Sequence, residues 1–578
     1  MISVLAGVRT MHKRNIVFVV GTSLVLTSNC FDPIFAQVPP GLPLPPQRPQ
    51  PPSLPPPPAP PPLAPVPLPP PAPESKEFPG LKVLVKDIDL RGNTIFTNEQ
   101  LSEVTSPYTN RELTIEDIEA LRLALTLYYI NRGYATSGAT VPDQDFSGNI
   151  LIVQIVEGRL AMIDVEGNYW FRTSYIRSRI ERGAGPPVNV NALQERMQLL
   201  QLDSRFQRIN AELKPGLALG ESNLNVRVTE SYPFKVRFQF DNYQSPTVGA
   251  EKGLVTAEHQ NVTGFGDSLS VQYGQSRGVN PILNVRYAVP IHPSDTTLLL
   301  QYRRSAFGVQ AGPFKSLNIE NRTEIFSVGL RQPLYRSLQH EFAVSLTGDH
   351  EKNESFLLGE PFEFVAGATN GQFRLSVARF GQEYTYRTGQ QVLSLLSRFS
   401  FGIGDVLDSN SSSSVAGSAD GRFFAWLGEA QGVRQLEFLR TQLISRVTAQ
   451  LTPDHLFPLE QVSVGGRYSV RGYREYSLVR DNATLASVEA RIPIYRTAAG
   501  VDTLFLAPFV DYGRAWNSQV DTPEPRTLAS VGGGLIWNIP WRDSRFEIYY
   551  GKQLNQFKLG NGNLQDHGVH LQLVVQAF

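Results

Sequence analysis

From Tyr232 to Phe578, apolar and polar residues alternate with a period of two. In the segment 234–241 the even positions are apolar and the odd positions polar, and in 484–492 the even positions are again apolar or small. Because successive side chains of a strand point to opposite faces, this pattern predicts strands with one apolar and one polar face. Repeated alternation with aromatic residues near strand ends is typical of a transmembrane β-barrel.

Sixteen candidate strands follow from this pattern, and each membrane span needs about 9–11 residues. They begin near Phe234, Leu254, Ser268, Leu283, Thr297, Glu324, Glu341, Phe373, Gln391, Gly421, Gln435, Thr484, Thr503, Leu528, Phe546 and Val569. A soluble β-sandwich or propeller is the competing interpretation, but no repeat of fixed blade length is visible. The predicted fold class is therefore a membrane β-barrel of about sixteen antiparallel strands, residues 232–578, preceded by two small α/β domains.

The first 36 residues have the parts of a secretory signal peptide. Basic residues precede an apolar run from Ile16 to Leu26, and the small residue Ala36 ends the segment. The run is too short for a transmembrane anchor. The single cysteine, Cys30, lies in this segment. The exported chain is therefore predicted to contain no disulfide, no cysteine-based zinc site and no cysteine nucleophile.

Residues 37–80 form a proline-rich segment, densest between Pro39 and Pro73. Proline fixes φ and lacks an N–H group, so helix and sheet are excluded and an extended linker is expected. A docking strip for a proline-binding domain is the alternative, and the spacer is favoured.

Charge and motif content exclude several other classes. Lys and Arg together number 53, as do Asp and Glu, so no basic excess suggests a nucleic-acid partner. Histidines are scattered without ligand spacing, and Gly532-Gly533-Gly534 is followed by no phosphate-loop lysine. No metal and no cofactor are predicted.

Two modules with the same order of elements lie between residues 81 and 231. The first has strands at 83–90, 139–142 and 150–157 and a helix at 113–132; the second has strands at 162–168 and 224–230 and helices at 175–182 and 191–202. Gly92 and Gly167 follow the first strand of each module, and Glu157 and Glu230 end the last strand at almost the same offset. This near-constant offset predicts an internal repeat of a β-α-α-β-β unit.

The order of elements, the Gly-Tyr turn and the final Glu157-Gly158 resemble the polypeptide-transport-associated (POTRA) domain. Such domains precede the barrel of outer-membrane protein transporters. The resemblance implies that the modules 81–159 and 160–231 receive unfolded chains by adding a substrate strand to an open sheet edge. The alternative is that both modules are periplasmic spacers.

The connection between the eleventh and twelfth predicted strands contains Val470-Arg471-Gly472-Tyr473, preceded by Gly465-Gly466. Two strands later the chain reads Phe509-Val510-Asp511-Tyr512-Gly513. These segments resemble the Val-Arg-Gly-Tyr loop motif and the Phe-x-Asp-x-Gly strand motif of the outer-membrane protein transporter superfamily. The resemblance implies that the loop folds back into the lumen and that Arg471 pairs with Asp511.

Strand phase independently supports an inward Asp511. If Leu504, Leu506 and Val510 point to lipid, Asp511 points into the barrel. The planar guanidinium of Arg471 can hold a carboxylate with two hydrogen bonds, and Gly472 permits a tight turn.

Three interpretations compete for the pair between Arg471 and Asp511. A catalytic constellation lacks its nucleophile, base and orienting group. A solvated surface pair contributes little. A lock that holds one of two loop states is favoured. Glu489 and Arg491 also face the lumen by phase, although ordinary cross-strand pairing explains them equally well.

Together, two POTRA-like units and a sixteen-strand barrel with the arginine loop resemble the two-partner secretion transporters, or haemolysin secretion/activation proteins. The resemblance implies an outer-membrane translocator and not an enzyme. It implies that the POTRA units recognise an unfolded secreted exoprotein in the periplasm and that the barrel secretes it without nucleotide hydrolysis. Members often carry an N-terminal plug helix, for which the segment after Gln37 leaves no room.

Further partners implied by the resemblance are outer-membrane lipid and the barrel assembly machinery. The terminal Phe578 resembles the signal that barrel proteins present for insertion, although Leu571, Leu573 and Val575 are out of phase with it. A factor that inserts other barrels into the outer membrane is the alternative function, and such factors usually carry more POTRA units. A diffusion porin would not need residues 82–231.

Overall fold

The computed structural model describes residues 82–578 except 313, 411–417, 556, 558–561 and 578. The predicted signal peptide (1–36), the predicted linker (37–80) and Phe578 lie outside the described residues. Within the described part, no helix has the length and apolar character needed to cross a membrane.

The first module has a three-stranded sheet with two helices and, beside it, a separate two-stranded antiparallel sheet. Its elements are β1 (Val83–Val85), β2 (Asp87–Arg91), α1 (Asn98–Thr105), β3 (Arg111–Leu113), α2 (Ile115–Ile130), β4 (Gly138–Thr140) and β5 (Ile150–Val156). The larger sheet has the order β2-β5-β4, with β2 parallel and β4 antiparallel to β5, and the smaller sheet pairs β1 with β3. Thr97 and Thr114 cap α1 and α2 through capping boxes, which satisfy the free N–H groups of the first turns.

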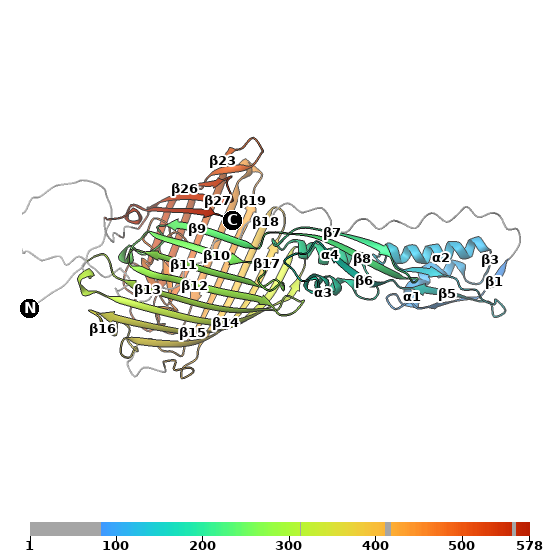
Figure 1. Cartoon of the computed structure of the whole chain (residues 1–578), viewed down its shortest axis with the longest axis horizontal. Coiled ribbons are helices and arrows are strands. Elements are labelled where there is room, and N and C mark those ends of the chain that lie inside the picture. The colour runs from blue at the N-terminus through green and yellow to red at the C-terminus, as the bar shows by residue number, and fades with distance from the viewer. Residues whose placement is uncertain (1–81, 313, 411–417, 556, 558–561, 578) are drawn as a thin grey trace, which may run out of the picture. The chain divides into compact units, whose positions relative to one another are not determined.

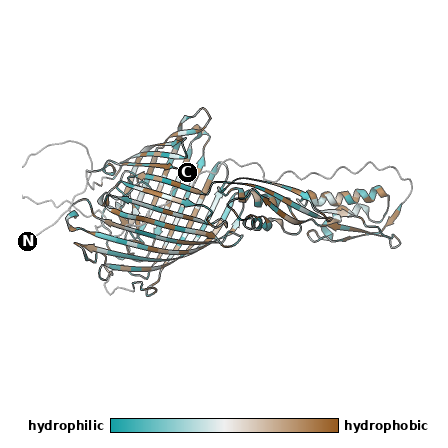
Figure 2. Ribbon diagram, viewed as in Figure 1, coloured by the Kyte–Doolittle hydropathy of each residue, from teal (hydrophilic) through white to brown (hydrophobic). Residues whose placement is uncertain are grey.

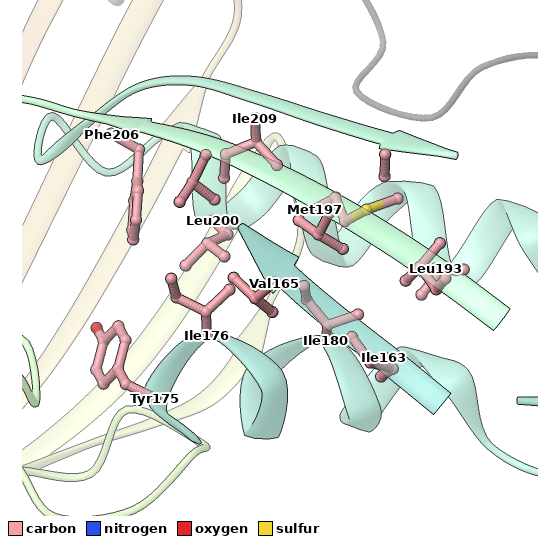
Figure 3. Close-up of a cluster of buried hydrophobic side chains, with 14 of the residues drawn as sticks. Ile163, Val165, Tyr175, Ile176, Ile180, Leu193, Met197, Leu200, Phe206 and Ile209 are labelled. Atoms are coloured by element: carbon pink, nitrogen blue, oxygen red, sulfur yellow. The ribbon is translucent and has the colours of Figure 1, made fainter. Parts of the chain in front are cut away.

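The second module repeats the three-stranded sheet and the two helices of the first. Its elements are β6 (Arg159–Glu166), α3 (Thr173–Ala184), α4 (Val190–Gln201), β7 (Phe206–Pro215) and β8 (Glu221–Glu230). The sheet order is β6-β8-β7, with β6 parallel and β7 antiparallel to β8. Apolar side chains from both helices and all three strands form one core, in which Ile176, Leu193 and Met197 are fully buried (Figure 3).

The repeated glycines and glutamates of the sequence have the same structural role in both modules. Gly167 follows β6 with φ +81°, and a Cβ atom there would lie 2.4 Å from the carbonyl oxygen of Val228. The carboxylate of Glu230 accepts the backbone N–H groups of Trp170 and Phe171 at 2.6 and 3.0 Å. A terminal glutamate thus fixes the turn between the first strand and the first helix.

The same contacts occur in the first module. Gly92 has φ +83°, and its added Cβ would lie 2.5 Å from the carbonyl oxygen of Ile155. Glu157 accepts the N–H groups of Thr94 and Ile95 at 2.8 and 3.0 Å. The near-constant offset in the sequence therefore reflects the same turn, with the same glycine and glutamate, in both modules.

The strands after the second module close into an antiparallel barrel (Figure 1). They are β9 (Phe234–Asp241), β10 (Lys252–His259), β11 (Ser268–Ser276), β12 (Val279–Pro290), β13 (Thr297–Gly308), β14 (Glu320–Arg336), β15 (His340–Leu357), β17 (Gln372–Arg387), β18 (Gln391–Gly402), β19 (Phe424–Gln435), β20 (Gln442–Leu451), β23 (Asn482–Arg496), β24 (Asp502–Leu506), β25 (Phe509–Trp516), β26 (Thr527–Ile539), β27 (Ser544–Gln553) and β28 (Val569–Gln576). The short β16 (Glu360–Pro361) pairs only with the end of β15.

Among the described residues the barrel has sixteen strands. Strands β24 and β25 both pair with β23 and β26, so they are two parts of one strand. Closure comes from β28, which pairs with β9 through residues such as Leu573 and Phe240. The predicted fold class is confirmed.

Alternation along the strands separates the two faces of the barrel wall (Figure 2). Val510 of β25 is paired with Val488 of β23 and Val531 of β26, and these three side chains are 56, 47 and 36% exposed. The next residue, Asp511, is 1% exposed. Because neighbouring residues point to opposite faces, an apolar outer row lies directly beside a polar inner row.

One predicted strand start is wrong. The eleventh strand was expected near Gln435, but Gln435 ends β19 and pairs with Gln442, where β20 begins. Leu439 and Arg440 of the connecting turn take positive φ values of 50° and 53°. Leu436 and Phe438 continue the alternation of β19 past Gln435 and it breaks only at Leu439, so the pattern alone did not place the chain reversal.

Candidate functional site in the barrel lumen

The connection between β20 and β23, residues 452–481, is named the lumen loop. It contains a short hairpin of β21 (Val462–Val464) and β22 (Leu478–Arg480). Together with residues of the wall, the loop forms a buried apolar cluster: Val462, Val464, Val470, Tyr473, Leu478, Ala483, Leu485, Ala515 and Leu528. The loop is thus packed against strands β23, β25 and β26.

Arg471 of the lumen loop is buried against the wall carboxylate of Asp511. Its Nε lies 2.8 Å from Oδ2 and its Nη2 2.8 Å from Oδ1. The backbone N–H of Arg471 also donates to Oδ2 at 3.0 Å. This two-point contact fixes the guanidinium plane, and side-chain exposures of 2% and 0% remove the pair from solvent.

Glu489 is a second wall carboxylate at the same arginine. It accepts a short hydrogen bond from Nη1 of Arg471 and another from Nε of Arg491, at 2.7 Å. Tyr549 donates its hydroxyl to the same carboxylate at 3.2 Å. Glu489 and Arg491 therefore belong to the network around Arg471, and Glu489 joins it to β27.

Two further motif residues explain why the lumen loop packs closely against the barrel wall. The guanidinium carbon of Arg471 lies 3.5 Å from the ring centroid of Phe509, within the range of a cation–π contact. An added Cβ at Gly513 would lie 2.6 Å from a methyl of Val464 and 2.9 Å from one of Val470. A side chain at Gly513 would thus displace the loop.

Gly472 brings the loop backbone against strand β27. It has φ +90°, and a Cβ atom there would lie 2.6 Å from the carbonyl oxygen of Gly551. Its N–H donates to Nε2 of His570 at 3.3 Å, and its carbonyl accepts from Gln553 at 2.7 Å. Both the positive φ and the close approach require glycine.

The remaining motif residues shape the loop itself. Gly465 and Gly466 have φ values of +108° and +103°, and a Cβ on Gly466 would collide with the carboxylate of Glu475. The hydroxyl of Tyr473 lies 3.0 and 2.9 Å from the carbonyl oxygens of Ala529 and Asn555. Val470 is fully buried.

Several contacting residues were not predicted from the sequence. Arg467 of the loop pairs with Glu547 of β27 at 3.1 Å, and Nη2 of Arg474 donates to Asp566 at 2.8 Å. Arg467 directly follows Gly465-Gly466, so the sequence shows an arginine close to the loop motif. Its partner is about 80 residues away in the sequence and depends on barrel register, which the alternation does not fix.

The site is an assembly of buried, mutually satisfied charges between a loop and a barrel wall. Breaking such a pair by removing one partner is costly, because the other charge stays buried. The arrangement can therefore hold the lumen loop in one defined position.

Proteins with related sequences and structures are transporters of the outer membrane. The outer membrane transporter CdiB of Escherichia coli O6:K15:H31 (strain 536 / UPEC) is 24% identical over 496 residues, covering 80% of this chain and 78% of the relative. CdiB of Dickeya dadantii (strain 3937) is 24% identical over 484 residues, covering 78% and 79%. The solved structure of CdiB from Escherichia coli has the same fold, with a TM-score of 0.65, 21% identity and coverage of 87% of this chain and 92% of that one.

Two family profiles match the chain. The profile of the ShlB-type POTRA domain matches residues 83–158. The profile of the haemolysin secretion/activation protein ShlB/FhaC/HecB matches residues 220–536, more than half of the chain. These matches confirm the predicted resemblance, the outer-membrane location with periplasmic POTRA units, and a transport rather than an enzymatic role. The chain therefore belongs to the ShlB/FhaC/HecB family of haemolysin secretion/activation proteins, the outer-membrane transporters of two-partner secretion.

Proposed function

We propose that this transporter recognises its unfolded exoprotein in the periplasm through the POTRA units and releases the lumen loop to let the chain pass. The proposed domain boundaries are those expected from the sequence: 81–159 and 160–231 for the two POTRA units and 232–578 for the barrel. The observation that carries the proposal is the burial of a loop arginine, Arg471, between two wall carboxylates, Asp511 and Glu489.

Topology supports a gating role for the lumen loop. The POTRA units are periplasmic and precede β9. When the barrel strands are counted from β9 as the first, the first, third and every later odd strand therefore run outward across the membrane. Strand β20 is the eleventh, and its connection to β23 leaves the wall on the extracellular side. Loop residues Val470 and Arg471 are nevertheless 0% and 2% exposed. A loop that starts outside and is buried inside occupies space that a translocating chain needs.

The second POTRA unit offers an open edge for strand addition at β7. Among the described strands, β7 pairs only with β8. The opposite edge, β6, is partly covered, because Nε of Arg177 in α3 donates to the carbonyl of Ile163 at 3.1 Å. An extended exoprotein segment can pair with the free N–H and C=O groups of β7 whatever its side chains are.

The proposed cycle uses no nucleotide. The exoprotein crosses the inner membrane unfolded, and its N-terminal region adds a strand to β7. The lumen loop leaves its seat, and the chain threads the barrel. Folding outside the cell supplies direction, because the folded exoprotein cannot return through the lumen. Outer-membrane lipid surrounds the barrel, and the barrel assembly machinery inserts it.

Deletion of the gene tests the proposed function. Loss of one or two large proteins from the culture medium, with outer-membrane barrels unchanged, is the expected result. Broad loss of barrel proteins would instead identify an assembly factor. Unchanged secretion with reduced uptake of small solutes would identify a porin and refute the proposal.

Two single-cysteine variants test whether the exoprotein pairs with the open edge of β7. Asn210→Cys places a thiol on the exposed side of β7, and Asp164→Cys is the matched control on β6. Disulfide trapping with single cysteines along the N-terminal region of the exoprotein should occur at Asn210→Cys and not at Asp164→Cys. Equal trapping at both strands, or trapping only at β6, would refute strand addition at β7.

A further inference from the structure

A second cluster of buried charges holds the other half of the lumen loop. Arg379 of β17 points at Glu460, which lies in the loop before β21. Nη1 of Arg379 is 2.9 Å from Oε2 of Glu460, and Nη2 is 2.5 Å from Oε1. The pair is bidentate, and side-chain exposures of 12% and 6% place it out of solvent.

The part of the lumen loop before β21 packs in its own apolar cluster. The rings of Phe457 in the loop and Phe373 in β17 are stacked with centroids 4.7 Å apart. Leu456 and Leu459 are buried in the same cluster with residues from β17 and β19. The cluster is separate from the one that contains Val470, and four barrel strands, β18, β19, β20 and β23, lie between β17 and β25.

We propose that Glu460 and Arg379 form a second anchor of the lumen loop, independent of the first and of opposite polarity. At the first anchor the loop supplies the arginine and the wall the carboxylates. At the second anchor the loop supplies the carboxylate and the wall the arginine. The inference rests on the proposed gating role of the loop and adds two positioning residues to it.

The second anchor is built to release its loop residue. On the wall, Arg379 also donates to Asp349 at 2.6 Å and to Glu351 at 3.3 Å. When Glu460 leaves, the guanidinium keeps its contacts with Asp349 and Glu351, so no unpaired charge remains on the wall.

At the first anchor, too, the wall carboxylates keep other hydrogen-bond partners when the loop leaves. Glu489 keeps the hydrogen bond from Arg491 after Arg471 leaves, and Asp511 keeps the one from Ser487 at 2.7 Å. A loop that must be seated and unseated needs this property, because an unpaired buried charge would otherwise raise the free energy of the released state.

Opening of the purified full-length transporter in planar lipid bilayers tests the second anchor. Glu460→Gln removes the loop charge while keeping its size. Glu429→Gln is the matched control, since Glu429 lines the same lumen cavity of about 520 Å³. Glu460→Gln should raise the opening frequency about tenfold or more, and Glu429→Gln should leave it near the wild-type value. Equal frequencies in the two variants would overturn the proposal.

A double variant distinguishes the second anchor from the first. Independent anchors predict that the increases in opening frequency of Glu460→Gln and Arg471→Ala multiply in the double variant. A double variant no different from either single one would show a single anchor and overturn the proposal. An effect of Glu460→Gln without any effect of Arg471→Ala would instead refute the gating role assigned to Arg471 and leave the second anchor standing.

Two controls separate positioning from folding. Resistance of the barrel to heat and detergent on gels should be unchanged in each variant. Glu460→Asp keeps the charge but lacks the reach for two hydrogen bonds, so its opening frequency should lie between those of the wild type and Glu460→Gln. A Glu460→Asp variant that opens as often as Glu460→Gln would contradict a role for the charge.

Discussion

Replacement of Arg471 by alanine should leave the barrel folded and abolish secretion. The guanidinium of Arg471 does not contribute to the strand ladder of the barrel. It connects the lumen loop to Asp511, Glu489 and Ser487. The seated loop is one of the two states of the proposed cycle, so a variant that cannot hold this state cannot complete the cycle.

The free-energy cost of Arg471→Ala depends on which buried groups lose their partner. Alanine removes the side-chain donors of a buried pair, while Asp511 stays 1% exposed. Breaking a buried ion pair in this way costs about 3–5 kcal/mol. Asp511 keeps its hydrogen bond from Ser487 and Glu489 keeps its pairing with Arg491, so we expect a cost at the lower end of this range. A loss of about 3 kcal/mol changes the ratio of seated to released loop about 10²-fold.

The assay measures exoprotein in the culture medium together with heat-modifiability of the barrel. Arg514→Ala is the control, because Arg514 lies on the same strand with its side chain on the exposed face. We expect normal secretion from the control and none from Arg471→Ala, with equal amounts of folded barrel in the membrane. Full secretion by Arg471→Ala would refute the assignment, and loss of the folded barrel would show that Arg471 serves assembly rather than gating.

Two further outcomes follow from local geometry. Gly472→Ala should reduce secretion, because φ +90° and the carbonyl of Gly551 at 2.6 Å exclude a Cβ; Gly533→Ala, whose Cβ would meet nothing within 4 Å, is the control that should secrete normally. In the first POTRA unit, burial raises the pKa of Glu157, but hydrogen bonds from Thr94 and its neighbour outweigh burial and lower the pKa below 4.5. Because the folded pKa is depressed, this contribution to stability is present above the unfolded pKa and is lost as the pH falls through the folded one. Hydrogen exchange in the full-length protein, corrected for intrinsic rates, should show the Thr94 turn opening more readily as the pH falls below 4.5, and Glu157→Gln should remove this dependence; a pH dependence that persists in the variant would contradict the reasoning.

Features with short sequence periods were predictable. A period of two predicted the strands, because side-chain direction alternates residue by residue. The nearly equal offsets of Gly92 and Gly167, and of Glu157 and Glu230, predicted a repeated module, and the structure gives the reason: each glutamate binds the turn that follows each glycine. Alternation gave no stop signal at Gln435, because a tight turn can continue the pattern.

Contacts that depend on register were not predictable. Asp511 was placed inside the barrel by phase, and a motif resemblance suggested its partner. No comparable motif contains Glu460 or Arg379, which are separated by 81 residues and meet only because the loop returns to β17. One sequence carries no signal for a pairing of that kind, since a one-residue slip in register would turn Arg379 outward.

The lumen loop combines two kinds of interaction that do different things. Apolar packing around Val470 and around Phe457 holds the loop without specifying a position, because hydrophobic contact is non-directional. The anchors at Arg471 and Glu460 require one geometry each, so they select a single seated position. Their opposite polarity also matters for release. The lumen loop as a whole carries four arginines and four carboxylates in residues 452–481, so it adds no net charge to the lumen when it is packed there and removes none when it leaves.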